Sequence, residues 1–465
     1  MERIGDIMEK DKAKYFLSVR NSKAVASADV ALDSITVLSG VNASGKSTLA
    51  RILHEIINLN AQYPVLLKRY AWVPVREWAA QIVLFKDRLL KPTAGVLSAI
   101  SVQNSVRSFE DRFSSEGLAD VLDSLERFVL QTISDYVAVA GNGDAKRAFM
   151  AFVRAVGVGE DLASDVEAVL NVFRNKKARA LERYANASSI RNYEVYNHVR
   201  ELKFDISWLT DAERVELYED GEPVYAVHRN ADTQLLDRTF ALKEIFGVRQ
   251  SLYIASPWVS IPQMTNDGGV VMKYDDFPHY PVSGGVRGDS DLFSEIGDEI
   301  YADESTGRKR WMVRIAGCSK PIDLSDCATG FKSMAILNIL FKGGFLNSET
   351  LLIVDEPEAH LHPQWVVAYA RILVLIAKHL KVRMLLTSHN PDMISSLKVI
   401  SQAEGLSGVR FYVANEHVAN GLRQYDYESL GMNIEPIFRK FNVALDRIDT
   451  YGGKSATRSL DDDFE

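Results

Sequence analysis

Cysteine is scarce in this sequence, which contains only Cys318 and Cys327 among its 465 residues. Two cysteines cannot build a framework of several disulfides, and no metal-site spacing of cysteine and histidine surrounds them. The sequence therefore predicts a protein of a reducing compartment, whose fold does not depend on disulfides.

Long apolar runs and a strong positive charge are also missing. The longest apolar stretch, residues 365–380, is interrupted by Arg371 and Lys378 and is too short to span a bilayer. The N-terminal stretch is too polar for a signal peptide. Because the net charge is −8, contact with nucleic acid would require a local basic patch. We expect a cytoplasmic protein of two or three globular domains, without membrane association.

A phosphate-binding pattern lies near the N-terminus. Residues 34–39 predict a short strand, residues 48–57 predict a helix, and GVNASGKS stands between them. This G-x-x-x-x-G-K-S spacing in that context is typical of a loop whose N–H groups wrap a phosphate. Lys46 would contact the β- and γ-phosphates and Ser47 would bind Mg²⁺. The nucleotide-binding candidates are Gly40, Asn42, Ser44, Gly45, Lys46, Ser47 and Thr48.

A second stretch combines an apolar run with acid. Residues 351–354 predict a strand buried on both faces, and Asp355 and Glu356 follow it directly. Open α/β sheets place their ligands at the carboxyl ends of such strands. Asp355 would then support Mg²⁺, and Glu356 would orient or deprotonate a water. The alternative is a strand that ends in an ordinary acidic turn.

A third stretch repeats this pattern downstream. Residues 382–388 predict another buried strand that ends in polar residues, and His389 follows it. His389 would stand at the same sheet edge as Glu356 and contact the γ-phosphate or the attacking water. A structural histidine at the strand end is the alternative.

A fourth stretch, residues 326–333, precedes an apolar helix at 334–341. A turn of small residues that opens a helix offers free N–H groups, hydroxyls and a dipole to phosphate. A plain core helix with an N-cap would look much the same. The candidates here are Thr329, Gly330, Lys332 and Ser333.

The middle of the chain has helical periodicity from about residue 76 to residue 190. We therefore expect residues 1–60 and 301–465 to form two halves of an α/β head. Residues 61–200 would form a helical insertion, and 201–300 a strand-rich lobe with a loop at 262–290. The insertion carries a basic segment that is either a solvated surface or a contact for nucleic acid or a partner. Its members are Arg174, Lys176, Lys177, Arg179, Arg183 and Arg191.

Four stretches in this order resemble the ABC-type ATPases of the SMC, RecF and OLD-like group, in particular ATPases of phage-defence systems such as Septu and PARIS. They are GVNASGKS, CATGFKSM, LLIVDEPEAHLHP and LLTSHNP. The resemblance implies an α/β fold, an ABC-type P-loop ATPase head with a mixed sheet and an inserted helical domain. It also implies ATP and Mg²⁺ as cofactors, with Ser47 and Asp355 at the metal.

The same resemblance implies that Glu356 is the catalytic base and His389 the switch histidine. Residues 328–333 would be the signature motif, which contacts ATP bound by a second copy, so that composite sites hold a dimer or a higher oligomer together. Two positions depart from the family pattern, since Ala328 replaces a serine and His362 replaces an aspartate. Gln250 and Gln263 are the candidates for the glutamine that contacts Mg²⁺.

About 75 residues follow His389, which is short for the Toprim nuclease domain of OLD-type relatives. We therefore expect a sensor or scaffold of an anti-phage system that hydrolyses ATP and controls a separate nuclease effector. The alternative is an SMC- or RecF-like ATPase that binds DNA in repair or chromosome maintenance. A transporter subunit is a third class, and a compact chain of about half this length would fit it better.

Overall fold

The computed structural model divides the chain into two compact units, one within residues 1–61 and 205–465 and the other within residues 62–204. We call them the head unit and the helical unit. The structure describes residues 13–61, 63–90, 99–158, 166–187, 212–229, 241–242, 245–255, 258–261, 270–273, 299–303, 305, 310–314, 320–419 and 421–440.

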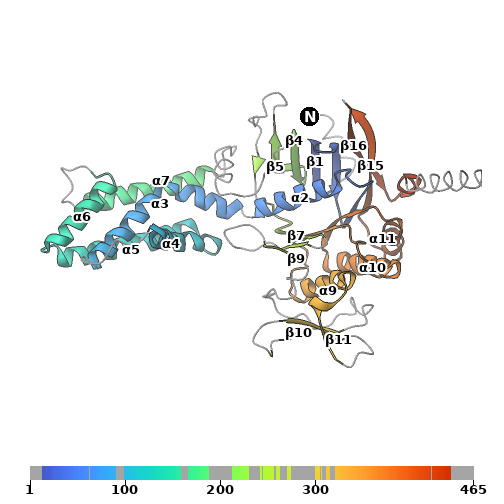
Figure 1. Cartoon of the computed structure of the whole chain (residues 1–465). Helices are drawn as coiled ribbons and strands as arrows, with labels where there is room; N and C mark the ends of the chain where they lie inside the picture. The colour runs from blue at the N-terminus through green and yellow to red at the C-terminus, as the bar shows by residue number, and fades with distance from the viewer. Residues whose placement is uncertain are drawn as a thin grey trace, which may run out of the picture. The chain divides into compact units, whose positions relative to one another are not determined.

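The head unit is built on a mixed sheet of thirteen described strands, in the order β6-β5-β4-β1-β2-β16-β15-β3-β14-β13-β7-β8-β9 (Figure 1). Five neighbouring strands, β15-β3-β14-β13-β7, are parallel, and antiparallel strands extend the sheet on both sides. The strands are β1 (Tyr15–Ser22), β2 (Val25–Leu32), β3 (Ile35–Ser39), β4 (Arg214–Glu219), β5 (Glu222–His228), β6 (Ala241–Leu242), β7 (Gln250–Ala255), β8 (Trp258–Ile261), β9 (Val270–Lys273), β13 (Thr350–Asp355), β14 (Arg383–Ser388), β15 (Val409–Ala419) and β16 (Leu422–Gly431).

Helices cover both faces of the parallel strands. Alternate residues of a strand point to opposite faces, and Ser251 and Tyr253 of β7 contact His54 of α2 (Lys46–Ala61). Leu252 and Ile254 instead belong to the core formed with α9 (Thr329–Lys342), α10 (Pro363–Leu380) and α11 (Pro391–Ala403). A small second sheet leads into α9 through η6 (Leu324–Asp326). Its strands are β10 (Glu299–Asp303), β11 (Arg310–Arg314) and β12 (Ile322–Asp323).

The helical unit has a core of its own, in which aromatic side chains predominate. Its longest described helix, α3, packs against α4, α5, α6 and α7. Trp78 of α3 contacts Phe152 and Phe173 at ring-centroid distances of 5.7 and 4.6 Å. The elements are α3 (Tyr63–Leu90), α4 (Ala99–Glu110), η1 (Asp111–Ser114), α5 (Leu118–Val139), α6 (Gly143–Ala155) and α7 (Val166–Ala187).

This architecture confirms the predicted α/β class, with a mixed sheet and helices flanking it. A hairpin joins β4 to β5 through two residues in the left-handed region, Asp220 (φ 50°) and Gly221 (φ 82°). The predicted lobe at 201–300 does not appear as a separate sheet in the described part, because β4, β5 and β7 belong to the main sheet. Most of the loop expected at 262–290 lies outside the described residues, as does the start of the lobe at 201–211.

The helices that the structure describes include none with both the length and the apolar character needed to cross a membrane.

Candidate functional site

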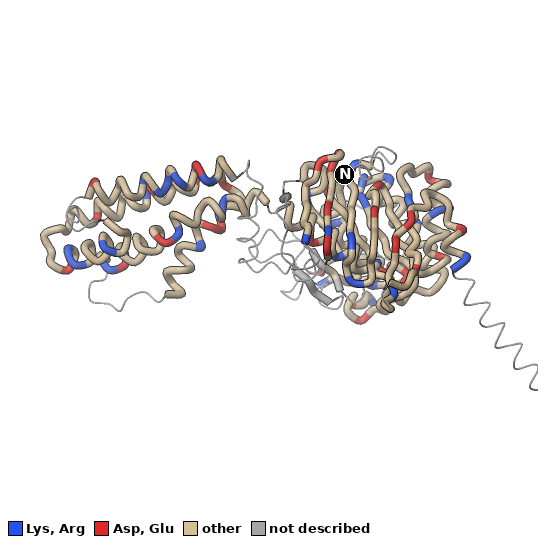
Figure 2. The backbone as a smooth tube through the Cα atoms, turned by 90° about the horizontal axis from the view of Figure 1, so that it is seen from above, with Lys and Arg blue, Asp and Glu red and all other residues tan. Residues whose placement is uncertain are grey.

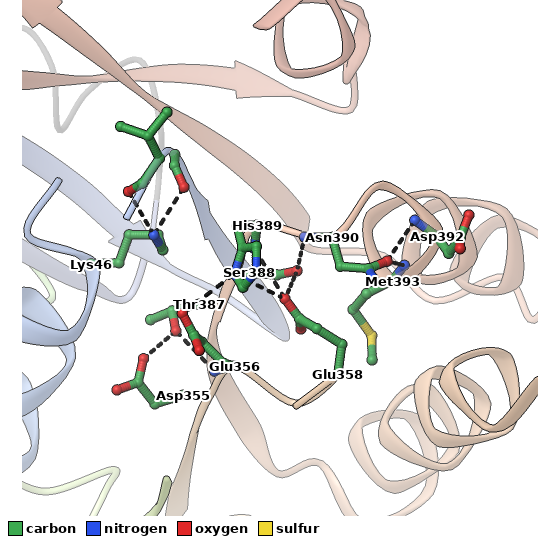
Figure 3. A network of polar contacts seen from close by, with 12 residues as sticks. Lys46, Asp355, Glu356, Glu358, Thr387, Ser388, His389, Asn390, Asp392 and Met393 are labelled. Carbon is green, nitrogen blue, oxygen red and sulfur yellow. Dashed lines mark hydrogen bonds and ion pairs between the residues drawn. The ribbon is translucent and has the colours of Figure 1, made fainter. Parts of the chain in front are cut away.

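Three parallel strands, β3, β13 and β14, bring polar residues at their carboxyl ends together in the head sheet. Asp355 at the end of β13 is aligned with Thr387 of β14, and Ser388 is aligned with Ser39 of β3. Since parallel strands point the same way, the loop after β3, the acidic residues after β13 and His389 after β14 meet at their carboxyl ends. The first, second and third stretches of the sequence analysis therefore lie together at one site (Figure 3).

The loop of residues 40–45 leaves β3 at Gly40 and enters α2 at Lys46. Gly45 has a φ of +94°, and a Cβ there would lie 2.4 Å from Cγ2 of Val25 in β2. Any other residue at position 45 would therefore be strained and would clash. The buried Tyr427 of β16 donates its hydroxyl to the carbonyl oxygen of Ser44 at 3.2 Å. Both contacts fix the loop against the sheet.

The side chains of this loop differ in exposure. Asn42 is exposed, Ser47 and Thr48 are half-buried, and Ser44 is buried. Lys46 is only 4% exposed, and its Nζ donates to the carbonyl oxygens of Gly40 and Val41 at 2.9 and 3.0 Å. Burial lowers the pKa of Lys46, while the charges of nearby carboxylates, Glu356 first among them, raise it. Acid at this edge therefore helps to keep the lysine charged.

Asp355 links the loop to the sheet. Its Oδ1 accepts hydrogen bonds from the hydroxyls of Ser47, at 2.9 Å, and Thr387, and its Oδ2 accepts one from Tyr253 at 2.8 Å. A hydroxyl and a carboxylate side by side are the ligands that Mg²⁺ takes from a protein when phosphates and waters supply the rest. Ser47 and Asp355 therefore fit the metal that the sequence predicts.

Glu356 has a strained backbone, with φ at 54°. Its N–H donates to the carbonyl and hydroxyl oxygens of Thr387 at 3.0 and 3.1 Å, which hold it in the left-handed region. Its carboxylate is 40% exposed and lies 3.3 Å from Nδ1 of His389. A carboxylate that is accessible to water and sits beside an imidazole has the geometry of a general base.

Glu358 is a further acidic residue of this site. It is 7% exposed, and its Oε1 accepts from the Ser388 hydroxyl at 2.9 Å and the His389 N–H at 3.1 Å. Oε1 also lies 3.6 Å from Nδ1 of His389. Sequence reasoning missed Glu358, Thr387 and Tyr253. The one signal for Glu358 was a third acid in the run Asp-Glu-Pro-Glu.

The stretch 326–333 starts α9 and packs against the turn that follows β13. A Cβ on Gly330 would lie 2.7 Å from the carbonyl oxygen of His360, so glycine permits this close approach. Thr329 and Gly330 are half-buried, whereas Lys332 and Ser333 are buried, and the Ser333 hydroxyl donates to the carbonyl oxygen of Thr329 at 3.2 Å. Of the four candidates, Thr329 and Gly330 are the more accessible.

Gln250 does not lie at the site. It stands at the start of β7, and its side-chain amide donates to the carbonyl oxygen of Phe345 and the hydroxyl of Thr350. Thr350 is the first residue of β13 and Asp355 is the last, so Gln250 lies at the opposite ends of the parallel strands from Asp355. Parallel pairing excludes it as a Mg²⁺ contact from within the same chain. Gln263 lies outside the described residues.

The basic segment lies on α7, a helix of the helical unit that carries both basic and acidic residues (Figure 2). Arg174 pairs with Glu167, Lys177 pairs with Asp123 and Glu126, and the guanidinium of Arg183 lies 3.8 Å from the ring centroid of Tyr70. Three of the six predicted residues thus have partners within the helical unit. Arg191 lies outside the described residues.

Comparison with known proteins gives one family match. A family model described as "AAA domain, putative AbiEii toxin, Type IV TA system" matches residues 292–395, which include Asp355, Glu356 and His389. No curated protein matches the chain.

Solved structures that are similar include heads of SMC proteins. An SMC head bound to the C-terminal winged-helix domain of ScpA is 12% identical, over 89% of this chain and 97% of that one, with a TM-score of 0.34. An SMC head with an extended coiled coil, bound to a ScpA domain from Pyrococcus furiosus, is 10% identical, over 93% and 98%, with a TM-score of 0.30. The SMC head from Thermotoga maritima is 10% identical, over 88% and 97%, with a TM-score of 0.28.

Proposed function

We propose that this chain is an ABC-type ATPase that binds Mg-ATP at the carboxyl edge of its head sheet and closes on it as a dimer. One observation carries the proposal, namely the 2.9 Å hydrogen bond from Ser47 to Asp355, with Glu356 and His389 adjacent. It joins residues that are 308 positions apart in the sequence into the set that phosphoryl transfer requires.

The roles follow from the chemistry of each group. The N–H groups of the loop and the Lys46 ammonium bind the phosphates, and the start of α2 adds the positive end of its dipole. Ser47 and Asp355 would hold Mg²⁺, which neutralises charge on the phosphates when bound. Glu356 accepts the proton of the attacking water, and His389 contacts the γ-phosphate or that water.

A second copy would complete the site. The start of α9 has no side-chain cap at Ala328, and the first N–H groups of a helix suit the γ-phosphate of a nucleotide held by another chain. Thr329 and Gly330 would make this contact. ATP then lies between two chains in a head-to-tail pair.

At the level of the cell, the proposed role is that of a sensor or scaffold in anti-phage defence, which restrains a separate nuclease until infection. The resemblance to Septu and PARIS ATPases supports it, as does a family description that mentions a toxin–antitoxin system. A pull-down of the chain with the products of its neighbouring genes tests it. Recovery of a nuclease is expected, and a complex without one would count against this role.

The ATPase itself is tested with two substitutions and a control. We expect Glu356→Gln to bind ATP and to accumulate as a dimer while turnover falls by about 10²–10⁴-fold. Lys46→Ala should lose both binding and dimerisation. Glu404→Gln is the control. Glu404 lies at the C-terminal end of α11 and pairs with Lys378, so this variant should hydrolyse ATP normally. Normal turnover by Glu356→Gln would contradict the proposal.

Direct DNA binding, as in an SMC- or RecF-like maintenance ATPase, is the second candidate. Lys176 and Arg179 of α7 favour it, since neither has a partner among the described residues. It predicts ATPase activity that DNA stimulates, with an affinity that falls steeply with salt. Lys176→Gln with Arg179→Gln should then reduce the salt dependence, and equal DNA binding by the variant would exclude α7 as the contact.

A further inference from the structure

Glu358 has an unusual position for a carboxylate that is not proposed to bind metal or substrate. Its side chain is 5% exposed, and its Oε1 accepts both the hydroxyl of Ser388 and the N–H of His389. Its Oε2 is buried and has no hydrogen-bond partner in the described part of the chain. A buried acceptor without a donor is costly, so this carboxylate would be stabilised by a further hydrogen bond.

The imidazole of His389 lies beside the carboxylate of Glu358. Its Nδ1 lies 3.3 Å from Oε1 of Glu356 and 3.6 Å from Oε1 of Glu358, so it stands between two carboxylates (Figure 3). The two differ in surroundings, since the side chain of Glu356 is 40% exposed and that of Glu358 is 5% exposed. Only Glu356 is accessible to water.

Nδ1 of His389 is itself short of a partner. It is buried and makes no hydrogen bond within the described residues, although both carboxylates are close. If Glu356 turns to the attacking water in the proposed mechanism, its approach to Nδ1 is lost. Without another acceptor, a buried Nδ1–H would then stay unpaired, which is costly.

We propose that Glu358 is the positioning residue that takes over Nδ1–H of His389 when Glu356 turns to the attacking water. The inference rests on the proposed ATPase function and deepens it. Glu358 already fixes the backbone of His389, so a small rotation of the imidazole brings Nδ1 to its carboxylate. This contact would fix the tautomer of His389 and leave Nε2 available to the γ-phosphate.

Other groups around Glu358 are consistent with a role as acceptor. Burial raises the pKa of its carboxyl, and hydrogen bonds from its own N–H, from Ser388 and from His389 lower it in part. Lys46 is the nearby cation whose charge interacts with both Glu356 and Glu358.

A double-mutant cycle tests whether Glu358 acts through His389. Glu358→Gln should lower kcat by about tenfold or more in the wild-type background and by less than about twofold when His389 is already Ala. The Kd for ATP should stay within about threefold in every variant, because the contact is made after binding. A merely structural role of Glu358 would reduce kcat by the same factor in both backgrounds and would overturn the inference.

Two further measurements keep the test decisive. If Glu358→Gln does not fold, Glu358→Asp retains the charge but ends one methylene short, and the same non-additivity is expected. If turnover by His389→Ala is too slow to measure, ¹⁵N NMR spectra of histidine-labelled protein with bound ATP replace it. The Nδ1 resonance of His389 should differ between Glu356→Gln and the double variant Glu356→Gln/Glu358→Gln. The same resonance in both proteins would overturn the inference.

The outcomes separate this inference from the function on which it rests. Wild-type protein that neither binds nor hydrolyses ATP would defeat the proposed function. Wild-type turnover that requires Glu356 but is unaffected by Glu358→Gln would defeat only the inference. Glu404→Gln is again the matched control, with turnover expected to equal that of the wild type.

Discussion

The head unit and the helical unit use their buried residues in opposite ways. At the carboxyl edge of the head sheet, the buried or nearly buried residues include Lys46, Asp355 and Glu358, which cluster around polar partners. In the described part of the helical unit, Thr132 is the single polar residue classed as buried, and aromatic rings fill the core.

Stability and chemistry therefore reside in different parts of the molecule. A buried charge is costly unless it is paired, so a cluster of such charges is kept for a purpose. A core of packed aromatic rings carries no such cost, because the burial of apolar surface stabilises the fold directly. We therefore expect substitutions in the helical core to affect folding, and substitutions at the sheet edge to affect ligands.

The largest expected effect on stability is that of Trp78→Ala. Trp78 is 2% exposed and packs on Phe152 and Phe173, so its loss should destabilise the helical unit by about 3–5 kcal/mol. Thermal unfolding followed by circular dichroism measures this. The Kd of the head unit for ATP should not change if the two cores are independent.

Leu130→Ala is the control within the same unit, because Leu130 is 43% exposed and its loss should cost less than about 0.5 kcal/mol. A Trp78→Ala protein that no longer binds ATP would show that the comparison fails and that the head depends on the helical core.

The next effect concerns a buried charge that serves stability in the head unit. Glu216 of β4 is 4% exposed. Burial raises the pKa of its carboxyl, but hydrogen bonds from His228 and Arg214 outweigh this and lower it from 4.5 to about 2. Because the folded-state pKa is depressed, this stabilisation is present above pH 4.5 and is lost as the pH falls toward 2.

Glu216→Gln should therefore reduce the free energy of unfolding at pH 7 by about 3 kcal/mol. It should also make that free energy less dependent on pH in the acid range, as urea titrations at several pH values would measure. Glu435→Gln is the control, since Glu435 forms an exposed pair with Arg439 and should change stability by less than about 0.5 kcal/mol. A slope of stability against pH that is unchanged in Glu216→Gln would contradict the assignment.

A smaller effect is expected at the predicted metal site. The hydroxyl of Tyr253 donates to Oδ2 of Asp355, and burial raises its pKa far above the usual range, so that it stays a donor. Loss of a partner that orients a metal-binding carboxylate typically costs metal affinity. Tyr253→Phe should raise the Mg²⁺ concentration needed for half-maximal ATPase activity by about tenfold.

Tyr301→Phe is the control for the loss of a hydroxyl, because the Tyr301 ring contacts Arg314 in the small second sheet. An unchanged Mg²⁺ dependence in Tyr253→Phe would mean that Asp355 is held well enough by Ser47 and Thr387 alone.

The sequence predicted the elements of the head edge but only part of its contacts. The strand before the loop was expected at 34–39 and is β3 at Ile35–Ser39, and the acidic strand expected at 351–354 is β13 at Thr350–Asp355. Such strands can be predicted from the sequence, because a strand that is buried on both faces consists almost entirely of apolar residues.

The missed residues share a physical cause. Tyr253 contacts Asp355 across 102 positions, and Glu358 contacts Ser388 across 30. These contacts depend on which strands are neighbours, and strand order is not encoded in local periodicity. Gln250 is a further example. Only the parallel pairing of β7 with β13 shows that Gln250 lies at the end of the strands away from Asp355.

The smallest expected effect lies on the surface of the helical unit. Arg174 is half-exposed and pairs with Glu167, which is 61% exposed, so Arg174→Gln should change the stability of the helical unit by less than about 1 kcal/mol. The comparison between the units then predicts a second result, namely that ATP turnover is also unchanged, because no charge of the sheet edge is altered. Turnover with and without DNA separates the two interpretations of α7. A loss of turnover only in the presence of DNA would make the basic segment a functional surface, whereas no loss in either condition would leave it a solvated face.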